Sequence, residues 1–143
     1  LDADDPESEV VLRLEREPFE VLRMGSYVGS CLALGGIQSY SAPAVLLDIN
    51  KQVIYARDRR GHVLGRQVLA ISDTDHLVCF DVYPASASER LQELFWEYDW
   101  AFAEALGVEL YDPEAPEEAD GYHGSVRFVL AHDWWRDHAV QPL

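Results

Sequence analysis

The stretch from residue 51 to residue 83 constrains the fold most, because it holds three strand-like runs separated by two turns. Residues 51–57, 62–71 and 76–83 are rich in β-branched and aromatic side chains, which favour strands. Residues 58–61 (Asp-Arg-Arg-Gly) and 72–75 (Ser-Asp-Thr-Asp) carry the residue types that form turns. We therefore predict an antiparallel three-stranded meander over this stretch.

A long amphipathic helix is predicted directly after the meander. Apolar residues recur there at helical spacing: Leu91, Leu94, Phe95, Tyr98, Phe102, Ala105 and Leu106. We expect a helix over residues 88–106, with a capping box formed by Ser86 and Glu89 and with Gly107 at its end. Trp96 and Trp100 share a second stripe of this helix. Two alternatives stay open for them, namely burial in a groove of the protein's own sheet or presentation to a partner.

The N-terminal third predicts one strand and several short helices. Alternation indicates a strand over residues 10–15, and Pro18 suits the first turn of a helix. Four glycines surround a segment in which we expect a short helix around Cys31 to Leu34, closed by Gly35. Ser41 resembles an N-cap, and we expect a helix after it over residues 44–49.

The C-terminal part predicts a short strand over 108–111, an exposed acidic loop over 112–121, a last strand over 125–131 and a terminal helix or coil from residue 133. The sequence thus predicts an α+β fold with a mixed, mostly antiparallel sheet of five to six strands flanked by helices. We expect residues 1–9 to be a flexible acidic leader and residues 10–143 to be a single domain. Because the chain begins without Met, we expect it to be a fragment of a longer protein.

The net charge of the chain limits the classes of partner that it can bind. The 26 acidic and 11 basic residues give a formal net charge of −15, which disfavours general binding to nucleic acids or anionic membranes. No apolar run is long enough to span a bilayer. Two cysteines are too few for a disulfide scaffold, so we expect reduced thiols and a soluble, cytoplasmic protein. The expected partners are other domains or another protein.

A basic hairpin interrupts this acidic chain. Five basic residues lie close together in the sequence: Lys51, Arg57, Arg59, Arg60 and Arg66. Arg57, Arg59, Arg60 and Arg66, together with Trp96 and Trp100, are candidates for contact with a protein partner, a phosphate or a nucleic-acid backbone. The alternative is a solvated hairpin whose arginines pair with the abundant acids of the chain.

Three phrases between residues 53 and 112 resemble the GNAT superfamily of acetyl-CoA-dependent N-acyltransferases. They are the hairpin Val-Ile-Tyr-Ala-Arg-Asp-Arg-Arg-Gly-His-Val-Leu-Gly ending at Gly65, the strand end Val82-Tyr83-Pro84, and the helix end Ala-Glu-Ala-Leu-Gly-Val over residues 103–108. The resemblance covers roughly 60 residues. It implies a GNAT-like fold with acetyl-CoA as the cofactor. It also implies acyl transfer or, in a degenerate member, binding of an acyl-CoA-type or other ligand.

The resemblance also suggests which residues would bind the cofactor. The family holds the pyrophosphate on amides of a Gly-rich, basic loop at a helix N-terminus. Here that loop, residues 85–90, contains no Gly and only one Arg, so it departs from the family pattern. The implied cofactor-binding residues are Val82, Tyr83, Ser86, Ser88 and Arg90.

Cys31 supports a third hypothesis, a thiol-dependent enzyme. A helix beginning near Cys31 would lower the pKa of the thiol, and His62 would act as the general base, with Asp81 orienting it. The alternative is that Cys31 is a small buried packing residue. On a helix, Asp133 and Asp137 would share a face, but His132 and His138 would not converge, so we expect no metal site.

Overall fold

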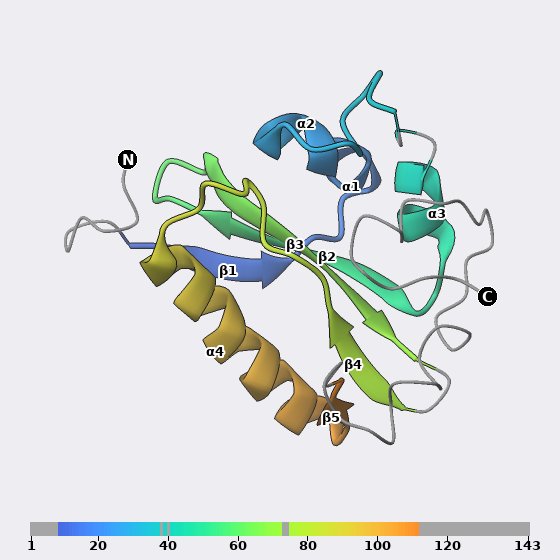
Figure 1. Cartoon of the computed structure of the whole chain (residues 1–143), viewed down its shortest axis with the longest axis vertical. Helices are drawn as coiled ribbons and strands as arrows, with labels where there is room; N and C mark the ends of the chain where they lie inside the picture. Colours follow the sequence, from blue (N-terminus) through green and yellow to red (C-terminus); the bar gives the residue numbers. More distant parts are fainter. Residues whose placement is uncertain (1–8, 38, 40, 73–74, 112–143) are drawn as a thin grey trace.

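Five strands form one mixed sheet in the described part of the chain, in the order β1-β2-β3-β4-β5 (Figure 1). The computed structural model describes residues 9–37, 39, 41–72 and 75–111. Its elements are β1 (Val11–Leu14), α1 (Pro18–Leu22), α2 (Met24–Val28), α3 (Ser41–Leu47), β2 (Lys51–Arg57), β3 (Val63–Ile71), β4 (His76–Cys79), α4 (Glu89–Leu106) and β5 (Glu109–Leu110). β1 to β4 pair antiparallel and β5 pairs parallel to β4, which confirms the predicted α+β class.

The hairpin between β2 and β3 forms as its turn residues predict. Asp58 Oδ1 accepts hydrogen bonds from the amides of Arg60 and His62, and Gly61 adopts the left-handed conformation with φ of 85°. A left-handed residue is costly for any side chain with a Cβ, which is why glycine stands at this place. The turn thereby sets the register in which Ile54 lies opposite Gln67.

Helices cover both faces of the sheet, with α4 on one face and α1, α2 and α3 on the other (Figure 1). Successive side chains of β2 point to opposite faces of the sheet, so β2 contributes to the core on each face. Val53 and Tyr55 pack toward α1 to α3, whereas Ile54 and Ala56 pack toward α4. A strand that is buried on both faces has few polar side chains, as the centre of β2 from Val53 to Ala56 shows.

The N-cap of α4 lies two residues after the predicted one. Ser88 is the N-cap, and its Oγ accepts a hydrogen bond from the amide of Leu91 at 3.2 Å. The prediction that Ser86 caps the helix was therefore wrong. Gly107 ends α4 in the left-handed conformation with φ of 70°, as predicted.

The predicted helix around Cys31 to Leu34 was also wrong. The helix in this region is α2, which ends before Cys31 because Gly29 adopts φ of 66°. The chain then turns back over α2, and the backbone of Ala33 comes so close to Gly25 that a Cβ there would lie 2.0 Å from the Ala33 nitrogen. The glycines of this segment thus permit a turn and a close backbone contact.

Several predictions lie outside the described residues. They are residues 1–8 of the acidic leader predicted over 1–9, the loop over 112–121, the strand over 125–131 and the terminal segment that includes His132 and His138. Among the helices that the structure describes, none is both long enough and apolar enough to cross a bilayer.

Candidate functional site

A bulge interrupts β4 before the chain reaches α4. Leu69 pairs with Cys79 on β4, and Arg66 forms an isolated bridge with Tyr83. Arg66 and Leu69 are three positions apart on β3, whereas their partners Cys79 and Tyr83 are four positions apart. The chain after β4 therefore carries one extra residue, which is a β-bulge. The predicted strand over 76–83 therefore ends at Cys79 as a regular strand. Bulges re-aim side chains and are enriched beside functional sites.

The implied cofactor-binding residues all lie between this bulge and the first turn of α4. Val82 and Tyr83 are half-buried, Ser86 is exposed, and Ser88 caps the helix. Arg90 is exposed, and its guanidinium pairs with Glu93 at 3.1 Å and with Glu97 at 3.4 Å. The amides of Glu89 and Arg90 have no acceptor within the described residues, as expected for a first helical turn. The side chain of Glu89 opposes an anion here.

A groove of about 480 Å³ lies between the bulge and the side of α4. We call it the β4–α4 groove, and its polar and aromatic lining comprises Gln67, Cys79, Glu89, Gln92, Glu93, Trp96 and Asp99. Val82 and Phe95 contribute apolar surface. The described lining contains three carboxyl groups and no Lys or Arg, and one of the three, Glu93, is paired with Arg90 outside the groove.

The inner end of the groove holds a buried polar cluster. Gln67 Nε2 donates to Phe80 O and to Asp99 Oδ2, each at 3.0 Å. Cys79 forms a further hydrogen bond with Asp99. Burial raises the pKa of Asp99 to about 6 against the hydrogen bonds from Gln67 and Cys79, and burial also raises the pKa of the Cys79 thiol.

Sequence reasoning missed this cluster, although one signal was available. Leu91, Phe95, Asp99 and Ala103 follow one another at intervals of four residues and form the buried stripe of α4. A carboxyl group on such a stripe is rarely found without partners inside the protein. The spacing placed Asp99 at the interface with the sheet, but only the fold brings Gln67 and Cys79 to it.

Arg66 does not lie on an exposed basic surface, so its assignment to an interaction surface was wrong. Its side chain is buried on the sheet face that α2 covers, with 1% of its surface exposed. The guanidinium donates to Ser30 Oγ at 2.9 Å and lies 4.8 Å from the centre of the Tyr83 ring. Burial lowers the pKa of Arg66 to about 10. The Arg66 guanidinium therefore interacts with buried groups of its own chain, Ser30 and Tyr83.

Acids of the same chain engage two of the other hairpin arginines. Arg57 pairs with Glu15 at 2.8 Å and with Glu20 at 3.4 Å, and Arg59 pairs with Glu9 at 3.0 Å. Arg60 is exposed at the tip. Lys51 is buried and pairs with Asp48 at 2.6 Å. The five basic residues therefore do not form one continuous surface.

The thiol site predicted from Cys31 and His62 does not form. Cys31 follows α2 instead of starting a helix, so its thiol does not lie at a helix N-terminus. His62 Nδ1 lies 3.0 Å from Asp58 Oδ2 on its own hairpin, and its ring forms no hydrogen bond to Cys31.

Trp96 and Trp100 lie on the solvent side of α4 with 63% and 55% of their surfaces exposed. Their rings meet edge to face, 6.1 Å apart. The alternative in which the protein's own sheet buries them was therefore wrong. Trp96 also lines the β4–α4 groove, whereas Trp100 lies one turn further along the helix.

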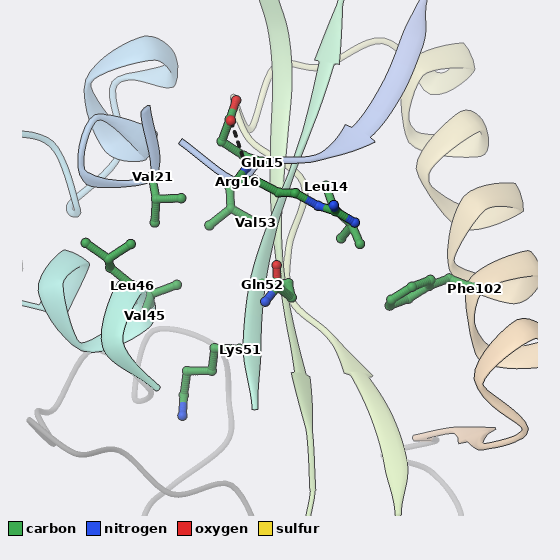
Figure 2. Close-up of a pocket in the computed structure, with 10 residues that line it drawn as sticks. All are labelled: Leu14, Glu15, Arg16, Val21, Val45, Leu46, Lys51, Gln52, Val53 and Phe102. Carbon is green, nitrogen blue, oxygen red and sulfur yellow. Dashed lines mark hydrogen bonds between the residues drawn. The ribbon is translucent and has the colours of Figure 1, made fainter. Parts of the chain in front are cut away.

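A second cavity of about 530 Å³ lies where β1, β2, α1 and α3 meet (Figure 2). Figure 2 shows Glu15 and Lys51 at opposite ends of its lining, with Lys51 Nζ directed away from Glu15. Lys51 is already bound to Asp48 and Glu15 to Arg57, so the charges here do not converge on one point. Within the described residues, no three metal-ligating side chains cluster.

Comparison with known proteins shows the class of fold. Protein-family models and curated proteins give no match. Among solved structures, a ribosomal-protein-alanine N-acetyltransferase from Brucella melitensis biovar Abortus 2308 is 15% identical with a TM-score of 0.54, over 77% of this chain and 84% of that one. An aminoglycoside N-acetyltransferase in complex with CoA is 12% identical with a TM-score of 0.52, over 91% and 98%. The chain has a GNAT-like fold, as the sequence resemblance implied.

Proposed function

We propose that this chain is a GNAT-like domain that binds an acyl-CoA-type ligand between the bulged end of β4 and the first turn of α4. The observation that carries the proposal is the position of that turn. α4 starts directly after the bulge, and the amides of Glu89 and Arg90 have no acceptor within the described residues. An anionic group at this point would receive hydrogen bonds from free amides and would be attracted by the helix dipole.

Arg90 is the cation that would contact the phosphates. It is exposed and pairs with Glu93 and Glu97, which are exposed as well. Exposed ion pairs contribute about 0–1 kcal/mol, so exchanging these carboxylates for a pyrophosphate costs little. Glu89 weakens the attraction, and we therefore expect an affinity in the micromolar to millimolar range.

Titration calorimetry with acetyl-CoA tests the proposal. We expect binding that weakens as salt is raised and that weakens about fivefold in Arg90→Gln. Arg59→Gln is the matched control, because it removes the same charge from an exposed ion pair that is remote in sequence from α4. An absence of heat at millimolar acetyl-CoA, or equal losses in both variants, would overturn the proposal.

Acyl transfer is the further activity that this binding would allow. Transfer to an acceptor releases the thiol of CoA, so release can be followed with a thiol-reactive dye in the presence of primary amines. Contact of the ligand with Val82, Tyr83, Ser86 and Ser88 is part of the same proposal. Binding without release would assign the chain to the degenerate, non-catalytic form of the fold.

A second candidate function, a protein-interaction module, is favoured by the exposed pair Trp96 and Trp100. Large exposed aromatic side chains are enriched at interfaces. We expect concentration-dependent association in sedimentation experiments, with Trp100→Ser reducing it. If the wild type and Trp100→Ser are both monomeric at all concentrations, the exposed tryptophans do not mediate self-association.

A further inference from the structure

β1 is an edge strand of the sheet, and the backbone groups along its outer side have no partner (Figure 1). The amide of Glu15 donates to Val53 O, so the odd-numbered residues of β1 turn their N–H and C=O groups toward β2. Leu12 and Leu14 therefore direct theirs away from the sheet. Val10 packs toward α4 as these two leucines do, so the alternation extends back to Val10. Within the part of the chain that the structure describes, these outward groups form no hydrogen bond.

β1 has few of the features that keep an edge strand unpaired. Edge strands are usually protected by Pro, by Lys or by a bulge. β1 contains neither Pro nor Lys, and its pairing with β2 is regular over Val11–Leu14. Its apolar side chains Val11, Leu12 and Leu14 are only half-buried. The outer side of β1 thus offers both hydrogen bonds and apolar surface to a further strand.

The sequence around β1 is complementary to itself in antiparallel orientation when Val11 lies opposite Val11 of a second copy. This register places Val10 opposite Leu12, and the two exchange backbone hydrogen bonds because both direct these groups outward. It also places Glu9 opposite Arg13. Both are exposed, and cross-strand pairs of opposite charge stabilise a sheet. A register with Arg13 opposite Arg13 is disfavoured by its like charges.

The surface beside β1 leaves room for the side chains of a second strand. A hollow of about 890 Å³ lies along the face of β1 that carries Glu9, Val11 and Arg13. Glu9 pairs with Arg59 at 3.0 Å, and their side chains are 62% and 69% exposed. Exposed ion pairs contribute little to stability, so Glu9 can exchange Arg59 for Arg13 of a second copy at small cost.

We propose that the outer edge of β1 binds a second copy of this chain, with the two β1 strands antiparallel and Val11 on the two-fold axis. The two sheets then form one continuous sheet, and a two-fold contact closes on itself instead of growing into a fibre. Because the paired strands are short, we expect a dissociation constant on the order of 10–100 µM. The inference does not depend on acyl-CoA binding, and its surface is distinct from the exposed pair Trp96 and Trp100 on α4.

Sedimentation velocity up to about 500 µM protein, a concentration that detects roughly millimolar affinity, measures the dissociation constant. About 0.15 M salt screens the repulsion between two copies that each carry a net charge of −15. Leu12→Pro and Leu12→Ala are a matched pair. Both remove the Leu12 side chain from the core, but only proline removes the outward N–H, which β2 does not use. We expect Leu12→Pro to dimerise at least tenfold more weakly than Leu12→Ala, with circular dichroism showing that both are folded.

A charge exchange between exposed positions leaves the core intact. Arg13→Glu and Glu9→Arg each place like charges opposite one another on both sides of the two-fold axis. We expect each to weaken dimerisation about fivefold, and the double variant to return to within about twofold of the wild type. Arg59→Gln breaks the same intrachain pair as Glu9→Arg, and we expect less than a twofold effect from this control. Equal weakening in the double variant and the single variants would overturn the inference.

The wild-type protein and Trp100→Ser complete the test. A wild type that is monomeric at about 500 µM would overturn the inference. Association that is lost in Trp100→Ser and retained in Leu12→Pro would assign the contact to the tryptophans and would also overturn it. Acetyl-CoA calorimetry is a separate measurement, so either proposal can fail while the other stands.

Discussion

The side-chain amide of Gln67 on β3 donates to the carboxylate of Asp99 on α4 at 3.0 Å, which joins the sheet to the helix through a buried polar contact. Each residue keeps one further oxygen without a partner. The ionised carboxylate is therefore only partly compensated for its removal from water. This incomplete compensation predicts how the stability of the protein depends on pH.

Asp99→Asn should stabilise the protein above pH 6. The pKa of Asp99 is raised from 3.8 to about 6 in the folded protein. A raised pKa means that the folded state holds the proton of Asp99 more tightly, so the contribution of Asp99 to stability is highest below about pH 4 and is lost as pH rises through 6. Two pKa units correspond to about 3 kcal/mol. The variant should lack this loss and gain about 2–3 kcal/mol at pH 7.5.

Urea denaturation of both proteins between pH 4 and pH 8 measures the difference. Glu93→Gln serves as the control, because it removes a carboxyl group from the exposed side of the same helix. If Asp99→Asn differs from the wild type by the same amount at pH 4 and pH 7.5, Asp99 does not titrate as described.

Ser88→Ala should destabilise the protein by about 1 kcal/mol, since Ser88 Oγ accepts the hydrogen bond from the amide of Leu91. Ser86→Ala should change stability by less than about 0.5 kcal/mol, because Ser86 is exposed and does not cap the helix. Thermal unfolding should show a decrease of about 3–5 °C for Ser88→Ala only. A larger effect at Ser86 would restore the capping box that the sequence predicted.

The sequence predicted those parts of the fold that local chemistry determines. Asp58 and Gly61 form the hairpin turn through their own conformations and hydrogen bonds, and Gly107 ends α4 in the same way. The hydrophobic stripe of α4 predicted its length, and Pro18 predicted the start of α1. These signals need no knowledge of distant residues.

The features that depend on tertiary contacts escaped the sequence. Alternation alone cannot show that α2 buries Arg66, because an arginine on a strand usually faces solvent. The extra residue of β4 is defined only by its pairing with β3. The buried cluster of Gln67, Cys79 and Asp99 joins two strands and a helix, so no single segment reveals it.

Arg66→Met should leave the unfolding free energy within about 1.5 kcal/mol of the wild type, or increase it. Methionine fills much of the same space, and the change removes a buried charge whose Nε has no partner. Arg66→Ala should instead cost about 2–4 kcal/mol, because it leaves a cavity beneath α2. Guanidinium chloride denaturation distinguishes the two. A loss of 3 kcal/mol or more in Arg66→Met would show that the guanidinium has strong compensating interactions.

Gly65→Ala should destabilise the contact between β3 and α4. A Cβ at this position would lie 3.0 Å from Leu91 Cδ2, 3.1 Å from Phe95 Cε2 and 3.3 Å from Tyr83 O. Such overpacking costs about 1–3 kcal/mol, because the helix must shift or its side chains must leave their preferred rotamers. This close contact is also the physical reason for a glycine near the start of β3.

Combining Gly65→Ala with Leu91→Ala tests the contact itself. Leu91→Ala alone should cost about 2–5 kcal/mol, because it empties part of the core on the α4 face. In the double variant the new methyl group occupies space that Leu91 has left, so the total cost should fall short of the sum by at least about 0.5 kcal/mol. Urea denaturation of the wild type and the three variants measures this coupling. Strict additivity would show that the Cβ at position 65 does not meet Leu91, and α4 would then lie further from β3 than described.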